Sequence, residues 1–411
     1  MNQALPLHLS HRLSRRLPIW GLLAGLLLAA CGHELHPTDP VLLPIRDKGA
    51  FGYINKVGEV VIPPSYAYCL PFSQHLGAVN IGGTGDGRHM PTNGKWGFVD
   101  VTGNLVINPQ FFSPITRGAP YDLESAALAL HEGYRFAEGL AAVRLENEWV
   151  YIDTLGHIVI RNTRIRSARR FSEGLANVYI GSRWGYIDRQ GNVVITPRYL
   201  TPANFKDGLA MVENEQGQRI VINQQGEPPA YLSQHTFVGP FFEGHAIILP
   251  GRPGAPTDKD PRRHAVIDMR GRSPFNPDSF YFDRLGRYGS GYLPALVGSA
   301  VGDPVNHPQL IRPTEEPGGK WGFINPKGHF VVSPVYEDAR GFSEGIGAVK
   351  QNGQWAYIGS NFGALTGHEF RWVGYFEREV AFVQLGPIHS DYDRRYAFIN
   401  SSGEVFWIEP D

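Results

Sequence analysis

Short segments in which aromatic, small and branched residues alternate recur along the chain and predict a series of β-strands. The clearest copies are Lys95–Gly103, Arg183–Gly191 and Lys320–Gly328, each with a Trp-Gly pair at its second and third positions. Weaker copies begin at Phe51, Trp149, Arg219, His264, Trp355 and Tyr396. Nine copies that start 34 to 57 residues apart predict a tandem array in which one core unit is repeated with insertions.

One face of this strand carries a fixed pattern of side chains. Alternate residues of a strand share a face, so the positions one and three after the leading aromatic point the same way. The third position is β-branched in all nine copies, as at Ile187 and Ile324, which is typical of a buried face. The first position is small in seven copies, as at Gly97, Gly185 and Gly322. A small residue beside a branched one predicts that another stretch of backbone approaches closely.

A second signature follows each strand and combines a turn with another short strand. Its copies include Phe136–Val143 and Phe171–Val178, in which a small residue again precedes a valine by two positions. We expect these small and branched residues to pack against those of the first strand. The acidic residue before the glycine recurs, and we interpret it as part of a turn, because a catalytic carboxylate pair is not duplicated along a scaffold. Its best copies are Glu138, Glu173 and Glu344.

An acidic or amide residue after the first strand, followed by glycine three positions later, predicts a hairpin turn. The pairs include Asp100 with Gly103 and Asp188 with Gly191, and Gly328 occupies the same place after an asparagine. The Asx side chain accepts a backbone N–H, and the glycine tolerates positive φ. Asparagine replaces aspartate freely here, which argues against a calcium site.

The repeated tryptophans allow two interpretations. One per repeat, beside a buried branched position, favours side chains that fill the core. A stacking ladder for sugar rings is the alternative. The tryptophans concerned are Trp96, Trp149, Trp184, Trp321 and Trp355.

These residues resemble the WG-repeat family of bacterial proteins, named for the Trp-Gly pair, over about residues 47 to 407. The resemblance is most specific around Trp184 and Trp321, where both signatures occur. It implies an all-β architecture and little chemistry. We expect about nine units of three short antiparallel strands in an open, curved, solenoid-like array, with a closed β-propeller as the alternative. The long interval after His264 divides an N-terminal array, 47–263, from a C-terminal array, 264–411.

The first thirty residues are typical of a secretory signal. Three arginines precede the apolar stretch 17–30, which is too short to span a membrane. The sequence Leu28–Gly32 looks like a bacterial lipobox, which implies lipid attachment at Cys31, and 31–46 is interpreted as a tether. An ordinary signal peptide is the alternative. We therefore expect a lipid-anchored protein of the bacterial cell envelope, facing the periplasm or the cell surface, with its other thiol, Cys69, buried.

Composition narrows the functional classes. The chain has 38 basic and 39 acidic residues, so no bulk positive charge predicts nucleic-acid binding. Its 42% hydrophobic residues predict a folded chain. Two cysteines and scattered histidines give no metal site, and no catalytic or cofactor motif is present.

Three functions remain open. The first is a non-catalytic, membrane-anchored binding scaffold with a protein or glycan partner, because an extended repeat surface suits recognition through many contacts. Residues that occur in one unit only, on loops, are better candidates for function than repeated ones. The second is an envelope enzyme acting on glycans, and the third is a structural spacer. The enzyme would use single acids of the long insertion 114–134, namely Asp122, Glu124 and Glu132. A later insertion predicts an aromatic patch of Tyr281, Phe282, Tyr288 and Tyr292, and the alternative is that the insertions are divergent surface loops.

Overall fold

The computed structural model describes residues 41–84, 91, 93–113, 132–249, 264–274, 282, 284–298, 319–366, 370–386 and 395–410. The signal segment 1–30, Cys31, Asp122, Glu124 and Tyr281 lie outside the described residues. All thirty named elements are β-strands, and they pair in antiparallel fashion in sheets that follow the chain. The prediction of an all-β tandem array is confirmed.

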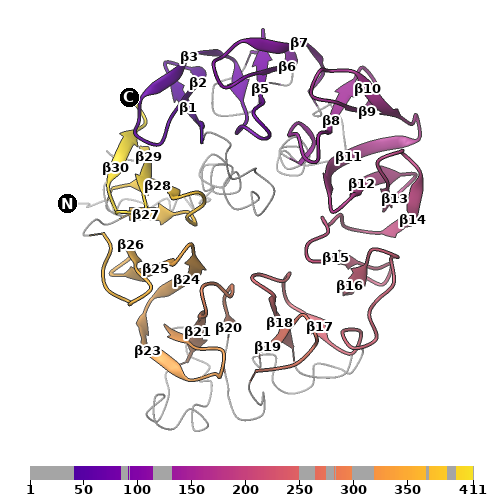
Figure 1. Ribbon diagram of the computed structural model, residues 1–411. Coiled ribbons are helices and arrows are strands. Elements are labelled where there is room, and N and C mark those ends of the chain that lie inside the picture. Colours follow the sequence, from indigo (N-terminus) through magenta and orange to yellow (C-terminus); the bar gives the residue numbers. More distant parts are fainter. Residues whose placement is uncertain are drawn as a thin grey trace, which may run out of the picture.

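The strands fall into nine consecutive units, which we number in chain order. The most complete units have four strands each. Within such a unit the strands pair in sequence order, from the inside of the molecule to its outside (Figure 1). The second unit contains β4 (Tyr68–Cys69), β5 (Gly77–Ile81), β6 (Lys95–Val99) and β7 (Leu105–Phe111). The fourth contains β11 (Ile165–Ser172), β12 (Leu175–Ile180), β13 (Arg183–Ile187) and β14 (Val193–Tyr199). The seventh contains β20 (Arg284–Leu285), β21 (Leu293–Val297), β22 (Lys320–Ile324) and β23 (Phe330–Tyr336).

The other units repeat parts of this plan. The first has β1 (Leu43–Asp47), β2 (Ala50–Ile54) and β3 (Val60–Tyr66), and the third has β8 (Ala141–Leu145), β9 (Glu148–Ile152) and β10 (Ile158–Arg161). The fifth has β15 (Leu209–Glu213) and β16 (Arg219–Asn223), and the sixth has β17 (Thr236–Phe237), β18 (His245–Leu249) and β19 (Ala265–Asp268). The eighth and ninth share one sheet of β24 (Asp338–Ser343), β25 (Ile346–Gln351), β26 (Gln354–Ile358), β27 (Phe370–Val373), β28 (Val380–Leu385), β29 (Tyr396–Asn400) and β30 (Val405–Ile408).

The inner strand of the four-stranded units was not expected from the sequence. The three expected strands are the one after the Glu-Gly turn, the Trp-Gly strand and the outer strand. A fourth strand, such as β11, precedes the turn and pairs on the inner side of the sheet. Its residues differ between units, so no repeated pattern marks it in the sequence.

Small and branched residues face each other across the two central strands, as the sequence suggested. In the fourth unit Ala176 pairs with Ile187, and Val178 pairs with Gly185. The same exchange of a small for a branched partner occurs in the eighth unit, between β25 and β26. Ile187 and Ile324 are completely buried. This pairing packs each sheet tightly at its centre, where burial of each branched side chain contributes about 1.5–3 kcal/mol.

The Trp-Gly glycine meets backbone of the outer strand, so the close approach inferred from the sequence is confirmed. A Cβ at Gly185 would lie 2.5 Å from the carbonyl oxygen of Ile195 and 2.7 Å from the nitrogen of Pro197. The glycines Gly52, Gly97 and Gly322 meet the equivalent strand backbone in their own units. The proline has no N–H to offer, which suits an outermost strand whose free edge should not recruit another chain.

The array closes on itself, because the first and last units are in contact. Leu43 and Ile45 of β1 share a buried cluster with Phe382 of β28 and Phe398 of β29. At the surface the Lys56 Nζ donates to Glu379 Oε2 at 2.6 Å, across 323 residues of sequence. Figure 1 shows the resulting ring, with β29 and β30 beside β1 to β3. Of the two arrangements left open by the sequence, the structure has the closed, propeller-like one rather than an open solenoid.

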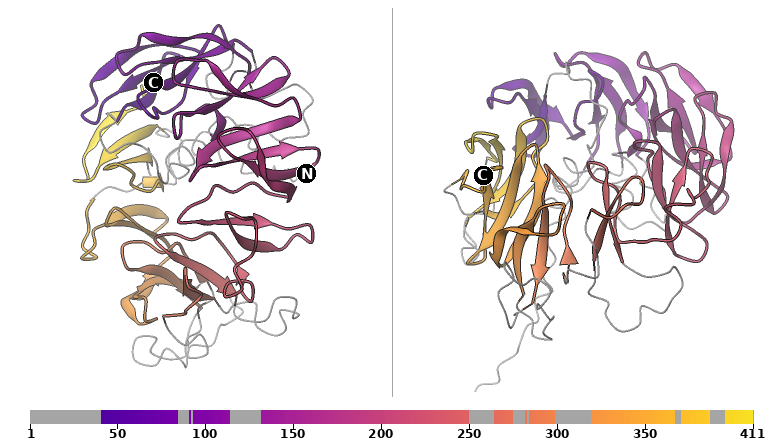
Figure 2. Two further views of the ribbon diagram at one scale, coloured as in Figure 1. Left: turned by 45° about the vertical axis from the view of Figure 1, so that its right-hand side comes forward. Right: turned by 60° about the horizontal axis from the view of Figure 1, so that its bottom comes forward.

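The views in Figure 2 show the same ring of sheets from two other sides. Cys69, on β4, is buried and unpaired with another cysteine, as expected. Burial raises the pKa of its thiol well above the usual range. In the part of the chain that the structure describes, no helix has the length and apolar character needed to cross a bilayer.

Candidate functional site

The repeated tryptophans fill the spaces between sheets. Their exposed fractions range from 0% at Trp96 to 9% at Trp184, and Trp149, Trp321 and Trp355 fall between these values. Trp96 packs edge-on against Tyr134 of the third unit, which in turn packs against Trp149. Side chains buried this deeply cannot stack on a sugar ring. The repeated indoles therefore belong to the core.

The repeated Asx and glycine residues close the hairpin between the Trp-Gly strand and the outer strand. The Asp188 Oδ1 accepts backbone N–H bonds from Gln190 and Asn192 at 3.0 and 2.8 Å. Asp100 makes the equivalent bonds to Thr102 and Asn104. The glycines that end these turns have φ near +85° to +90°: Gly103, Gly191 and Gly328. These hydrogen bonds occupy the carboxylates in turn geometry.

In four of the Glu-Gly turns the acidic residue links its unit to the next. Glu138 and Gly139 are the two central residues of a tight hairpin, both with positive φ. The carboxylate of Glu138 then accepts the N–H of Gly174 in the next turn at 3.0 Å. Glu173 accepts the N–H of Gly208 at 2.9 Å. Equivalent links are Gln74 to Gly139, Glu243 to Ser290, Ser290 to Gly345, and Glu344 to Arg378 and Glu379.

These hydrogen bonds between successive turns explain why the carboxylate recurs. Formation of the turn alone would not require a carboxylate. The ninth turn continues it, because its Glu379 holds Lys56 of the first unit. The serines that open three of these turns add a second link: Ser73, Ser172 and Ser343 donate to the carbonyls of Phe136, Phe205 and Phe376 in the following units. Repeated polar side chains therefore hold neighbouring units together.

We predict that Glu173→Ala lowers the free energy of unfolding by about 1 kcal/mol, because a charge-assisted hydrogen bond between two units is lost. Asp207 occupies the same turn position one unit later, with a similar φ of 54°, and its shorter carboxylate makes no such bond among the described residues. Asp207→Ala is therefore the matched control, with little expected change. Urea unfolding followed by circular dichroism measures both. Equal losses in the two variants would contradict the linking role of Glu173.

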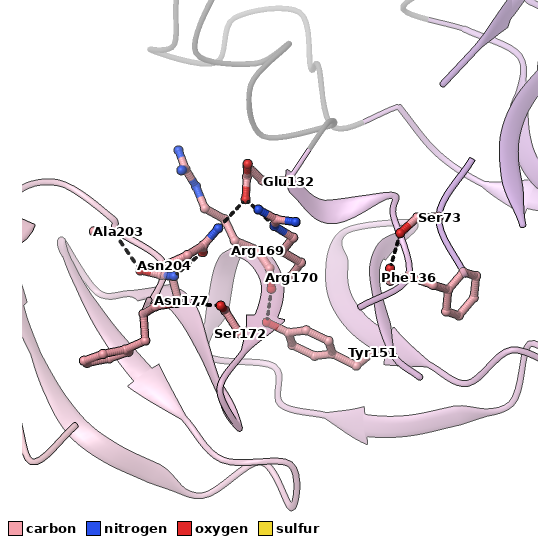
Figure 3. A network of polar contacts seen from close by, with 11 residues as sticks. Ser73, Glu132, Phe136, Tyr151, Arg169, Arg170, Ser172, Asn177, Ala203 and Asn204 are labelled. Atoms are coloured by element: carbon pink, nitrogen blue, oxygen red, sulfur yellow. Dashed lines mark hydrogen bonds and ion pairs between the residues drawn. The ribbon is translucent and has the colours of Figure 1, made fainter. Parts of the chain in front are cut away.

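One polar network joins side chains of three successive units, and it is the candidate site (Figure 3). Glu132, which precedes the third unit's turn, accepts hydrogen bonds from Arg170 of β11 at 3.2 Å and from Asn204 of the fifth unit at 2.8 Å. Asn177 of β12 donates to Asn204 Oδ1 at 2.9 Å and accepts the N–H of Ala203. We call these four side chains the Glu132 network. It joins the third, fourth and fifth units on the inner side of the ring.

Two more arginines surround the network. Arg135 is only 4% exposed, and Arg169 precedes Arg170 on the inner strand β11. A β-bulge between Ala168 and Phe171 contains Arg169 and Arg170 and places both beside Glu132. Bulges commonly redirect side chains in this way. The site therefore has three guanidinium groups around one buried carboxylate.

The carboxylate is held in its charged form. Burial alone would raise the pKa of Glu132, but the charges of Arg170 and Arg169 and the bond from Asn204 lower it overall. A carboxyl group that is ionised at neutral pH and bonded to two donors is poorly suited to act as a general acid. Glu132 is the one described member of the three acids proposed from the sequence, and here it orders its neighbours.

We predict that Glu132→Gln lowers the free energy of unfolding by about 2 kcal/mol at pH 7, because the charged partner of the arginines is removed. A folded-state pKa below the unfolded value contributes stability above about pH 4.3, which is lost as pH falls through the folded pKa. The difference between wild type and variant should therefore narrow in acid. Glu148→Gln is the control, since its pair with Arg161 is more exposed. A pH-independent difference in thermal unfolding would contradict the assignment.

The aromatic residues of the later insertion do not form one surface patch in the described part of the chain. Phe282 is 1% exposed and packs against Phe330 in the core of the seventh unit. Tyr292 packs against Phe342 and Phe362, in a different cluster. Tyr288 stacks on His245 of the sixth unit, with ring centroids 4.0 Å apart. The predicted patch is wrong for Phe282 and Tyr292, because both serve packing between sheets.

Sequence reasoning identified Glu132 but missed its partners. Arg169, Arg170 and Asn204 all lie one or two positions before the phenylalanine that opens the second signature. Comparison of the position directly before this phenylalanine would have shown a charged or amide residue in three successive copies, Arg135, Arg170 and Asn204. Among the described residues, no three His, Cys, Asp or Glu side chains gather as a metal site would require.

The described geometry agrees with comparisons to known proteins. The family model for the WG containing repeat matches residues 51–84, 96–111, 151–184, 184–216 and 321–355. The chain therefore carries WG repeats at five places along its length. No curated protein matches it.

Solved structures resemble the chain in fold alone. A eukaryotic initiation factor has a TM-score of 0.51 at 9% identity, over 90% of this chain and 96% of that chain. Apo AztD from Citrobacter koseri has a TM-score of 0.35 at 12% identity, over 90% and 94% of the two chains. BamB from Moraxella catarrhalis has a TM-score of 0.31 at 10% identity, over 60% and 79%. Only the first score is high enough to support a shared fold.

Proposed function

We propose that this WG-repeat protein is a non-catalytic binding scaffold, anchored by lipid in the bacterial cell envelope, with a protein or glycan partner. The observation that carries the proposal is the use of the repeated polar side chains. Glu138 and Glu173 bond to the next turn, and Asp188 bonds within its own turn. Because the repeated residues stabilise the ring, we expect the partner to be recognised by residues that occur in single units. Loops and inserts on a rigid scaffold commonly have this role.

The anchor is proposed from the sequence. A single acyl chain gives only reversible membrane binding, so stable attachment needs the several chains that a bacterial lipoprotein carries on its first cysteine. We expect labelled palmitate to enter the wild-type chain and not the variant Cys31→Ser. Cys69→Ser is the control, because that thiol is buried in the ring. Equal labelling of wild type and Cys31→Ser would refute the anchor.

The binding role is tested by pull-down from solubilised envelope, with protein made without residues 1–31 as bait. We expect at least one partner whose capture saturates with increasing bait. The control is the same bait unfolded in urea and immobilised, which retains composition but loses the ring. Capture that does not saturate, or that is equal on the unfolded bait, would leave a structural spacer as the better description.

A further inference from the structure

Arg169 is a charged side chain whose charge no group in the described structure neutralises directly. Its Nε is buried without a hydrogen-bond partner, and its guanidinium makes no hydrogen bond or ion pair with any described residue. Among the described residues its ring contact is with Trp184 of its own unit, whose ring centroid lies 5.4 Å from the guanidinium carbon. Glu132 lies nearby, but its hydrogen bonds are to Arg170 and Asn204 (Figure 3). Burial of a polar group without a partner is costly.

The repeat supplies a matched comparison four units later. Arg340 on β24 lies two residues before Phe342, as Arg169 lies two residues before Phe171. Its guanidinium carbon is 5.1 Å from the ring of Trp355, the tryptophan equivalent to Trp184. The Arg340 Nη1–H also donates a hydrogen bond to the carbonyl of Val373 in the next unit, and the guanidinium lies over Trp372. The same position thus holds a satisfied arginine in the eighth unit and an unsatisfied one in the fourth.

Two further arginines lie near Arg169 in the described part of the chain. The charges of Arg135, Arg169 and Arg170 all act on Glu132. Arg170 is already bonded to Glu132, and Arg135 is almost completely buried. Burial lowers the pKa of Arg169 even though Glu132 opposes that shift. An anion would supply the acceptor that Arg169 lacks among the described residues.

We propose that Arg169, with Arg135 and Arg170 beside it, forms a binding site for an oxyanion group on the inner side of the ring. The guanidinium presents its donors in a planar fork, which matches two oxygens of a carboxylate or a phosphate. The guanidinium group of Arg169 lies over Trp184 and beside the Glu132 network. These neighbours hold it in position before a ligand binds. The site extends the proposed binding role by naming the ligand chemistry, and in that respect it rests on that role.

The test titrates the mature chain with sodium phosphate, sodium acetate and sodium chloride at equal ionic strength, and measures thermal unfolding and heat of binding. We expect phosphate or acetate to raise the unfolding temperature in a saturable manner that chloride does not reproduce. Saturation by phosphate alone assigns the site to phosphoryl ligands, and saturation by both assigns it to carboxylates as well. The absence of any oxyanion effect beyond that of chloride would overturn the proposal. Because simple anions are the probes, this outcome is separate from failure of the pull-down.

Variants locate the site. We expect Arg169→Gln to weaken oxyanion binding at least tenfold and Arg340→Gln to leave it within twofold. Arg169→Lys keeps the charge but loses the fork, so an intermediate affinity is expected, and it remains informative if the Gln variant folds poorly. Unchanged affinity in Arg169→Gln and Arg169→Lys, or equal loss in Arg340→Gln, would overturn the assignment to Arg169.

Discussion

Gly185→Ala is expected to lower the free energy of unfolding by about 3 kcal/mol, although it adds a single methyl group. The new Cβ would lie 2.5 Å from the Ile195 carbonyl oxygen and 2.7 Å from the Pro197 nitrogen. Both obstacles are backbone, so no side-chain rotation can relieve the overlap. The strands β13 and β14 would have to separate where Trp184 pairs with Tyr199. Urea unfolding of the variant, followed by tryptophan fluorescence, measures the effect.

The chain contains its own control for this substitution. In the eighth unit the equivalent position is Ala356, and no outer strand with a proline follows it. Ala356→Gly should therefore cost only the smaller penalty of added backbone freedom, about 1 kcal/mol. Comparable stability of Gly185→Ala and wild type would show that β14 can move away at little cost, and would contradict the packing described here.

The same pair of residues shows what local pattern can predict. Glycine follows the leading aromatic in the four units whose outer strand carries a proline after its branched residues, at Gly52, Gly97, Gly185 and Gly322. Alternation over five residues indicates a strand and its buried face, because both depend on neighbours only a few positions away. The strands, their turns and the close approach at glycine were therefore predictable from sequence.

Closure of the ring was not predictable in the same way. It depends on the small rotation between each unit and the next, summed over nine units with insertions of different length. No single residue carries that sum. The buried cluster that contains Ile45, Phe382 and Phe398 joins segments more than 300 residues apart, and neither β1 nor β28 has a pattern that distinguishes it from the other strands.

The Glu132 network lies between these cases. Glu132 could be selected as a single acid in an insertion, because it stands outside the repeated signatures. Its role could not be predicted, because Arg170 and Asn204 reach it from two other units. Whether a lone carboxylate acts as an acid or as the centre of an ion pair depends on which charges surround it, and only the ring brings those charges together.

Phe382→Ala is expected to lower the free energy of unfolding by about 4 kcal/mol and to weaken closure of the ring. Phe382 is 3% exposed, and its ring lies 5.0 Å from that of Tyr396 in the cluster shared with β1. Removal of the phenyl group of Phe382 leaves a cavity between the first and last units. The surface pair of Lys56 and Glu379 is too exposed to replace the lost packing.

A cross-link reports closure directly. In protein made without residues 1–31, we expect Lys56→Cys with Glu379→Cys to react across a short bismaleimide in the native state and not in urea. Such a link joins residues 323 apart and changes gel mobility. Phe382→Ala should reduce the yield of the cross-link, because separation of the end units becomes more frequent.

Phe205→Ala is the control for this experiment. Phe205 is 1% exposed and packs on Tyr186, between the fourth and fifth units. It should destabilise the chain to a similar extent and leave the yield unchanged at temperatures where the protein is folded. Equal yields in the two variants would mean that the contact between the first and last units does not depend on Phe382.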